Sequence, residues 1–116
     1  MNTVSFSDFQ KLDIRVGTVV EAVVPEWSHW VMKLTVDFGD PPAGGGRKTV
    51  FAGIMKFYKP EQLVKKQFPF VINLEPKKMG PMGDFSEGMM IMSVVNDETP
   101  VLFKLWKKVP DGTIVR

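Results

Sequence analysis

Hydrophobic and polar residues alternate most clearly over residues 32–38 of the chain. Met32, Leu34, Val36 and Phe38 fall on one face of an extended backbone, and lysine, threonine and aspartate occupy the positions between them. A period of two with one apolar face predicts a half-buried antiparallel strand.

Other segments rich in β-branched and aromatic residues predict further strands. They lie at residues 14–24, 49–54, 68–74 and 89–95, with a sixth short strand at 101–105. Gly17 interrupts the first of them, and a glycine inside a strand often marks a bulge or a sharp bend.

Two short helices are predicted between or before these strands. Residues 5–12 form an amphipathic segment that a serine at position 5 or 7 can cap. Residues 59–64 indicate one or two helical turns, with Pro60 at the first helical position.

The remaining connections are expected to be loops. Residues 39–46 are rich in glycine and predict a flexible hairpin connection, because no Walker-type Lys-Ser or Lys-Thr pair follows them. Residues 75–86, rich in lysine, methionine, glycine and proline, are also expected to form a loop.

The order of these elements predicts the fold class. Five strands with a short helix between the third and the fourth are typical of an all-β, five-stranded OB-fold barrel. Strand spacing alone would also allow an SH3-like barrel. A length of 116 residues favours one domain over residues 1–116.

Composition narrows the possible chemistry. With no cysteine and one histidine, His29, the sequence excludes zinc–thiolate, iron–sulfur and multi-histidine sites, and it implies no cofactor and no metal. No paired carboxylates or nucleophile with a base appear at convincing spacing, so no enzyme activity is expected. Without a visible export signal or a membrane-length apolar run, a cytoplasmic location is expected.

The charge is distributed unevenly along the chain. Residues 47–78 hold eight basic and two acidic residues, a net charge of +6, whereas the whole chain carries +2. A basic segment suits a polyanionic partner, because neutralised phosphates release counterions. A solvated, lysine-rich surface that keeps the protein soluble explains the charge equally well.

Three motifs go beyond a general β pattern. They are Asp13-Ile14-Arg15-Val16-Gly17, then Val50-Phe51-Ala52-Gly53-Ile54, and finally Asn73-Leu74-Glu75-Pro76-Lys77-Lys78 leading to Ser86-Glu87-Gly88-Met89. In this order the chain resembles the tRNA-binding domain family, which includes stand-alone tRNA-binding proteins, CsaA-like proteins and the C-terminal domain of methionyl-tRNA synthetases. The resemblance implies an OB-fold, homodimerisation through added terminal elements and recognition of tRNA shape.

The resemblance also implies an RNA-binding face formed by Asn73, Lys77, Lys78, Ser86 and Met89. The two lysines suit phosphate contacts, which position RNA without selecting a sequence. The amide of Asn73 can bond a base edge or a sugar, or satisfy the backbone of a turn. Met89 can lie against a base or fill the core. Tryptophan in place of Ser86 is expected to block binding while the fold stays intact.

The aromatic residues near the chain's first turn have several interpretations. Trp27 and Trp30 can stack on bases, close the barrel or enter a dimer interface. For Trp30, packing or an interface is favoured, whereas the sequence does not decide between these roles for Trp27. His29 is expected to be a surface or packing residue. The apolar tail at residues 101–106 is expected to pack beside the barrel and to join a twofold interface.

Two functions follow from these observations. The first is a non-catalytic, structure-selective tRNA-binding homodimer, with an aminoacyl-tRNA synthetase as a further candidate partner. The second is a CsaA-like export chaperone that binds unfolded peptides through a methionine-rich and aromatic surface. No membrane partner is expected.

Overall fold

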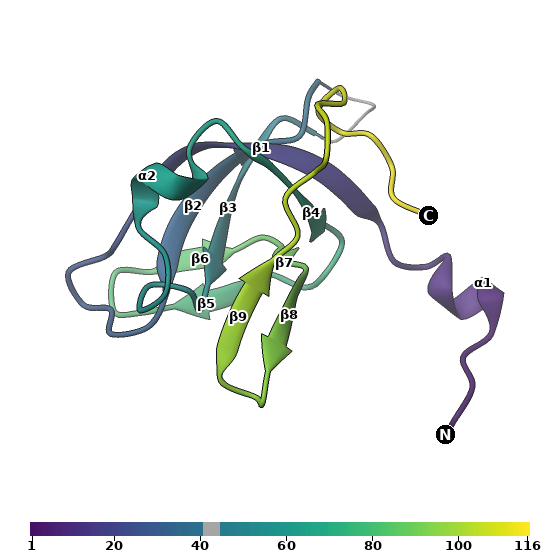
Figure 1. Cartoon of the computed structure of the whole chain (residues 1–116), viewed down its shortest axis with the longest axis horizontal. Coiled ribbons are helices and arrows are strands. Elements are labelled where there is room, and N and C mark those ends of the chain that lie inside the picture. Colours follow the sequence, from purple (N-terminus) through teal and green to yellow (C-terminus); the bar gives the residue numbers. More distant parts are fainter. Residues whose placement is uncertain (41–44) are drawn as a thin grey trace.

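The protein is described by a computed structural model covering residues 1–40 and 45–116, and its main feature is a strongly curved antiparallel sheet (Figure 1). The sheet has the strand order β3-β2-β1-β4-β7. Its strands are β1 (Ile14–Val23), β2 (Met32–Asp37), β3 (Arg47–Ala52), β4 (Gln67–Val71) and β7 (Met89–Met90). Residues 41–44, within the expected connection at 39–46, lie outside the described residues.

The two edge strands, β3 and β7, meet and nearly close the sheet into a barrel. The segment just before β7 crosses this seam, because the backbone N–H of Glu87 donates to the carbonyl of Thr49 at 2.8 Å. Helix α2 (Pro60–Leu63) lies between β3 and β4, and its Leu63 is fully buried. This arrangement confirms the predicted OB-like barrel.

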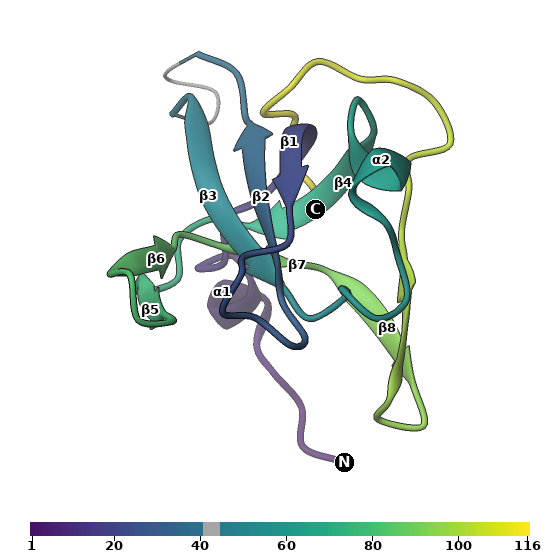
Figure 2. The same ribbon diagram turned by 90° about the vertical axis from the view of Figure 1, so that its left-hand side faces the viewer.

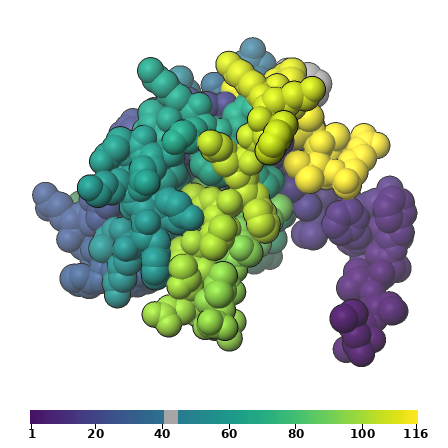
Figure 3. Space-filling view, viewed as in Figure 1, coloured from purple at the N-terminus to yellow at the C-terminus, as the bar shows by residue number. Residues whose placement is uncertain are grey.

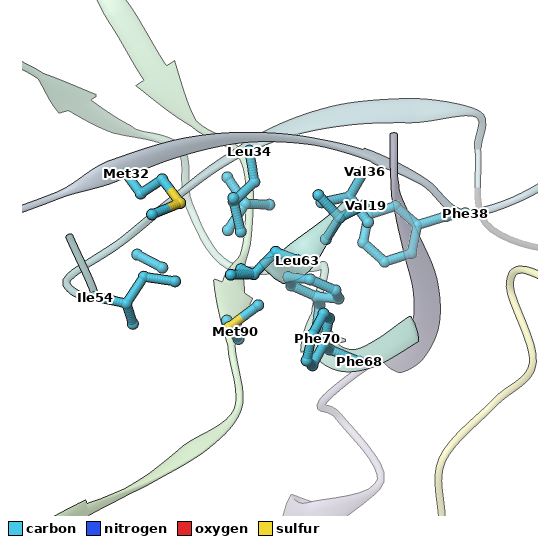
Figure 4. Close-up of a cluster of buried hydrophobic side chains, with 12 residues drawn as sticks. Val19, Met32, Leu34, Val36, Phe38, Ile54, Leu63, Phe68, Phe70 and Met90 are labelled. Atoms are coloured by element: carbon cyan, nitrogen blue, oxygen red, sulfur yellow. The ribbon is translucent and has the colours of Figure 1, made fainter. Parts of the chain in front are cut away.

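The barrel interior is filled by side chains from every strand of the sheet and from α2 (Figure 4). Phe38 and Phe70 meet edge to face, with ring centroids 5.4 Å apart. The alternation predicted at 32–38 is confirmed, since successive residues of β2 are buried and half-buried in turn. Burial of one apolar face therefore sets the register of this strand.

Both predicted helices form, and each is shorter than the segment predicted for it, residues 5–12 and 59–64. Helix α1 (Phe6–Phe9) is capped by Ser5, whose Oγ accepts the backbone N–H of Asp8 at 3.0 Å. Helix α2 begins with proline, and the Gln62 side chain accepts the backbone N–H of Lys59 at 2.7 Å. These bonds satisfy N–H groups that the first turn of a helix leaves free.

Gly17 has a packing role, and the irregularity of β1 lies elsewhere. The register between β1 and β2 shifts between Val19 and Glu21. A Cβ added at Gly17 would lie 2.5 Å from Cγ1 of Val36 and 2.7 Å from Cε1 of Phe38. The glycine therefore lets two core side chains approach the strand closely.

Gly17→Ala is expected to lower the free energy of unfolding by about 1–3 kcal/mol, because the added methyl group overpacks the core. Urea denaturation measures this change. Gly53→Ala is the matched control, since its Cβ would meet no described atom closer than 3.6 Å. Equal stabilities of the two variants would contradict the packing role of Gly17.

Two expectations from the sequence are wrong. The expected loop at 75–86 contains a hairpin of β5 (Lys77–Met79) and β6 (Asp84–Ser86). The strand expected at 89–95 is divided, because the chain leaves β4 after Met90. It continues as β8 (Met92–Val95), which pairs with β9 (Thr99–Leu102) in a second hairpin that projects from the barrel (Figures 1 and 2).

The end of the chain returns to the barrel. The first half of β1 pairs with β4 along one edge, and the C-terminal segment covers its other edge. Backbone bonds join Val16 to Thr113 at 2.9 Å and Val115 to Ile14 at 2.8 Å. The tail therefore packs beside the barrel through residues 112–115, whereas within the predicted 101–106 only Leu102 packs on the core and Leu105 bonds β4. Trp106 is fully exposed, so that part of the expectation is wrong.

Candidate nucleic-acid interface

A groove lies between the β5–β6 hairpin and the barrel, and it encloses about 260 Å³. We call it the hairpin groove. Its lining residues come from β3, the β4–β5 loop, the hairpin and the start of β7: Phe51, Leu74, Glu75, Lys77, Met79, Ser86, Gly88 and Met89. Three of the five sequence-predicted site residues, Lys77, Ser86 and Met89, are therefore brought together here.

The hairpin is held against the barrel by the loop between β1 and β2. Trp27 packs on Phe51, with ring centroids 6.0 Å apart. A Cβ added at Gly80, at the hairpin turn, would lie 2.4 Å from the Trp27 ring, and Gly80 has a φ of +68°. Only glycine meets both demands without strain. Lys33 and Asp84 add an ion pair at 3.4 Å. Of the roles considered for Trp27, packing is the one that its contacts with Phe51 and Gly80 support.

Ser86 forms part of the barrel seam. It is only 9% exposed, and its Oγ accepts the backbone N–H of Phe51 and donates to the carbonyl of Gly88, both at 3.0 Å. The hydroxyl thus joins β3 to the segment before β7. The expectation that tryptophan at this position leaves the fold intact stays a prediction, and these contacts argue against it, because the exchange removes the acceptor of the buried Phe51 N–H.

Gly88 and Met89 shape the opposite wall of the groove. A Cβ at Gly88 would lie 2.8 Å from the carbonyl oxygen of Val71, so close backbone approach explains this glycine. Met89 pairs with Val71 in the sheet, and its side chain is 51% exposed. The core-filling interpretation applies instead to Met90, which is buried in the barrel.

The two lysines of the hairpin face different ways. Lys77 lines the groove, as does Met79 two residues later, whereas Lys78 does not. Successive residues of a strand point to opposite faces, so Lys78 lies on the outer side of the hairpin. The groove rim carries one lysine and one glutamate, Lys77 and Glu75, both exposed.

Asn73 lies next to the groove and bonds the backbone. Its Oδ1 accepts the N–H of Asp13 at 2.7 Å, and its Nδ2 donates to the carbonyl of Lys11 at 2.6 Å. The amide thus ties the segment after α1 to the end of β4. Of the two interpretations of Asn73, backbone satisfaction is the one that these contacts support.

Phe51 was not among the predicted site residues. Its neighbours in β3, Val50 and Ala52, belong to the barrel core, and Phe51 points to the other face, under Trp27 and the groove. An aromatic residue on the outward face of a strand is the signal that could have identified it.

Trp30 and His29 lie away from the hairpin groove. Both are exposed, and Trp30 lines a separate depression of about 290 Å³ together with Phe57. Within residues 1–40 and 45–116, no helix has the length and apolar character needed to span a membrane. The same residues contain no cluster of three or more histidine, aspartate or glutamate side chains arranged to hold a metal ion.

The strand order and the near-closed sheet define an OB-like barrel. The family model described as "Putative tRNA binding domain" matches residues 14–114. The chain belongs to this tRNA-binding domain family.

Curated relatives come from methionine–tRNA ligases. The chain is 41% identical over 113 residues to the ligase of Methanothrix thermoacetophila and 39% identical over 115 residues to that of Clostridium acetobutylicum. These matches cover 97% of this chain, but only 16% and 17% of the two ligases. The chain therefore resembles one part of a longer enzyme.

Solved structures include similar chains of the same extent. A MetRS-related protein from Pyrococcus horikoshii is 34% identical with a TM-score of 0.89, and the match covers 100% of both chains. The chaperone CsaA of Bacillus anthracis is 33% identical with a TM-score of 0.84, over 99% of this chain and 100% of that one. The resemblance inferred from the sequence motifs is confirmed.

Proposed function

We propose that residues 1–116 act as a single, non-catalytic domain that binds tRNA by its shape through the hairpin groove. The observation that most supports this proposal is the groove itself. The groove brings the apolar side chains of Phe51, Leu74 and Met89 together with a lysine of the β5–β6 hairpin, in a member of a tRNA-binding domain family. These apolar side chains suit an unstacked base or a ribose, and the lysine suits the adjacent phosphate.

The five predicted residues take different parts in this proposal. Lys77 and Met89 contact the RNA from the groove, and Lys78 offers a second phosphate contact from the outer side of the hairpin. Ser86 and Asn73 act through the backbone that they fix, since their side chains bond Phe51, Gly88, Lys11 and Asp13. A shape-reading site of this kind selects bends and loops of RNA and reads little sequence.

Partners and location follow from the same proposal. An aminoacyl-tRNA synthetase is a proposed partner, because methionine–tRNA ligases carry a similar segment within a longer chain. A tRNA ligand makes the cytoplasm the proposed site of action.

The second candidate function is a peptide-binding chaperone. It is favoured by the likeness to CsaA structures from Bacillus anthracis and Picrophilus torridus, the latter at 28% identity. Exposed methionines at the hairpin, Met82 and Met89, offer an adaptable apolar surface.

Filter binding of total tRNA and of an unfolded, uncharged peptide across a salt series separates the two functions. The tRNA function predicts binding that weakens steeply with salt, because each phosphate contact releases a counterion. Peptide binding that is insensitive to salt, with no tRNA binding at low salt, would overturn it in favour of the chaperone.

A homodimer is part of the proposal. Helix α1 contains no buried residue and stands away from the barrel (Figure 3). Phe6 and Phe9, both exposed, are its apolar residues. Together with Ile114 and Val115 they line a depression of about 270 Å³. A four-residue helix has little stability alone, so an apolar partner surface is needed to hold it.

The projecting β8–β9 hairpin carries a second exposed apolar surface. Val95 and Val101 are about half exposed on it, and Phe103 follows in the adjoining tail. In a twofold interface each patch meets its counterpart on the other copy. Both surfaces lie outside the five-stranded sheet. The β8–β9 hairpin overlaps residues 101–106, where the sequence predicted the interface, whereas α1 fits the terminal elements that the family resemblance implied.

Sedimentation of the parent is expected to give a species of twice 13.1 kDa at micromolar concentration. Phe6→Ser combined with Phe9→Ser removes the apolar residues of α1 and is expected to yield a 13.1 kDa species. Phe85→Ser, on the β5–β6 hairpin, is the control and is expected to leave the dimer intact. A parent chain that sediments as a monomer would refute the homodimer.

A further inference from the structure

A further depression, of about 500 Å³, lies between the α2–β4 turn and the segment after β9. We call it the lysine groove. Lysines make up most of its lining, which consists of Thr18, Lys65, Lys66, Gln67, Lys104, Leu105, Trp106, Lys107 and Lys108. Three of the five lysines lie outside the basic segment at 47–78, so the charge pattern of the sequence did not predict this cluster.

The wall of the lysine groove at residues 104–108 is fixed at both ends by Gln67. The backbone carbonyl of Gln67 accepts the N–H of Leu105 at 3.2 Å. Its side chain, which is buried, bonds the carbonyl and the N–H of Val109 at 2.7 and 3.0 Å. The three residues between these anchors, Trp106 to Lys108, are therefore held out from the barrel on a short, tethered arch.

The opposite wall is also fixed. Lys65 adopts a φ of +70°, which L residues rarely take, and its N–H donates to the carbonyl of Val19 at 2.8 Å. The carbonyl of Lys66 accepts the N–H of Val19 at 3.0 Å. This pair of bonds to β1 sets both lysines at the edge of the depression.

The lysines of the groove make no ion pair within the described part of the chain, where the salt bridges are Lys11–Asp8, Arg15–Asp13 and Lys33–Asp84. The nearby carboxylate of Asp111 already accepts bonds from Thr18 and Gln67. The groove therefore presents an excess of positive charge that invites a polyanion.

Trp106 adds an aromatic surface to this charge. Its side chain is 100% exposed, although tryptophan is among the largest apolar residues. Lysines precede and follow it in the sequence, at positions 104, 107 and 108. A free aromatic ring among basic residues is the combination that holds single-stranded nucleic acid, because the ring stacks on a base and the lysines follow the phosphates.

The lysine groove and the hairpin groove lie at opposite ends of β4. Gln67, the first residue of β4, lines one, and Leu74, three residues after the end of β4, lines the other. The length of the strand alone separates them by roughly 13 Å. Figure 2 shows the β5–β6 hairpin and the segment after β9 on opposite sides of the molecule.

We propose that the lysine groove is a second RNA site, which binds a single-stranded segment by stacking one base on Trp106. The choice of RNA as the polyanion rests on the proposed tRNA-binding function. A folded tRNA has unpaired ends and loops, so the two grooves can contact a duplex bend and a single strand of the same molecule. The second contact adds affinity without adding sequence selectivity.

Other occupants fit the lysine groove less well. A twofold interface would bring each lysine cluster against its own copy, and like charges in contact repel. A flat anionic bilayer would reach the exposed arch at Trp106 and leave the half-buried lining of the depression, such as Thr18, without a partner. A strand with regularly spaced phosphates and flat bases matches both the shape and the composition.

The test uses a fluorescent oligouridylate of about eight nucleotides, which has no tRNA fold. Trp106→Ala is expected to weaken its binding, measured by anisotropy, by about 10-fold. Lys107→Ala with Lys108→Ala is expected to reduce the salt slope of binding by about 1.4, because each single-strand phosphate contact contributes about 0.7. All three residues are exposed, so the fold is expected to persist.

Matched controls separate this site from general charge effects. Trp30→Ala removes another exposed tryptophan, and Arg47→Ala with Lys56→Ala removes the same charge elsewhere; both are expected to bind the oligouridylate like the parent. Parental binding by Trp106→Ala, or equal losses in the controls, would overturn the site. So would Trp106-dependent binding to polyglutamate or to phosphatidylserine vesicles, or a change of sedimentation in Trp106→Ala.

The two proposals fail in distinguishable ways. A substitution in the hairpin groove, Met89→Glu, is expected to weaken tRNA binding and to leave oligouridylate binding unchanged. Loss of oligouridylate binding in Met89→Glu would mean that the single strand occupies the hairpin groove, and the lysine groove would then be refuted as its site.

Discussion

Met89→Glu is expected to weaken the binding of total tRNA by about 10- to 100-fold at moderate salt. The half-exposed methionine lines the hairpin groove together with Lys77. A glutamate there removes an adaptable apolar contact and places a negative charge beside the phosphates. The loss is expected for all tRNA species alike, because a shape-reading site does not discriminate by sequence.

Met82→Glu is the matched control for this variant. Met82 is more exposed than Met89, and it lies in the turn of the hairpin without lining the groove. Both variants change the net charge equally. If filter binding gave the same affinity for the two variants, tRNA would be responding to overall charge, and the hairpin groove would not be the site.

Ser86→Trp is expected to lower the free energy of unfolding by more than about 4 kcal/mol. The serine side chain is almost fully buried, and an indole in its place cannot make the two bonds that join β3 to the segment before β7. The backbone N–H of Phe51 would also lose its acceptor, and an unpaired buried donor costs about 1–3 kcal/mol by itself. Effects of this size arise when overpacking and lost hydrogen bonds combine.

Urea denaturation with Phe85→Trp as the neighbouring control tests this effect. Phe85 is about half exposed, so its exchange for tryptophan is expected to change stability by less than about 0.5 kcal/mol. A Ser86→Trp chain as stable as the parent would contradict the seam role of the hydroxyl. Because the fold is expected to fail, loss of tRNA binding in Ser86→Trp would not locate the binding site.

The parts of the fold that depend on local patterns were predictable from the sequence. The alternation at 32–38 fixes which face of β2 is buried, and Pro60 marks the first turn of α2. In both cases the determining interaction lies within a few residues of the pattern. The order of five strands with one intervening helix then leaves few topologies, and the OB-like barrel is one of them.

The β5–β6 hairpin was missed because its strands have no apolar face of their own. Three-residue strands give too short a pattern for a period of two to be recognised. The hairpin is stabilised from outside, by Trp27 against Gly80 and by the ion pair of Lys33 with Asp84. The two glycines at positions 80 and 83 are the turn signal in the sequence, and both adopt a positive φ in the structure.

The candidate site was only partly predictable, because residue type does not reveal the bonding partner. Asn73 and Ser86 are polar residues in a recognisable motif, yet they bond backbone groups 60 and 35 residues away in the sequence. The basic segment at 47–78 also divides, with Lys77 in one groove and Lys65 and Lys66 in the other. Only the folded chain decides which charges gather.

The central claim, that tRNA occupies the hairpin groove, is tested most directly by backbone amide NMR of the whole chain during titration with folded tRNA. The largest changes in amide chemical shift are predicted at Lys77, Met79, Gly88 and Met89, which line that groove. If tRNA saturates the protein while these amides keep their positions, the hairpin groove is not the tRNA site.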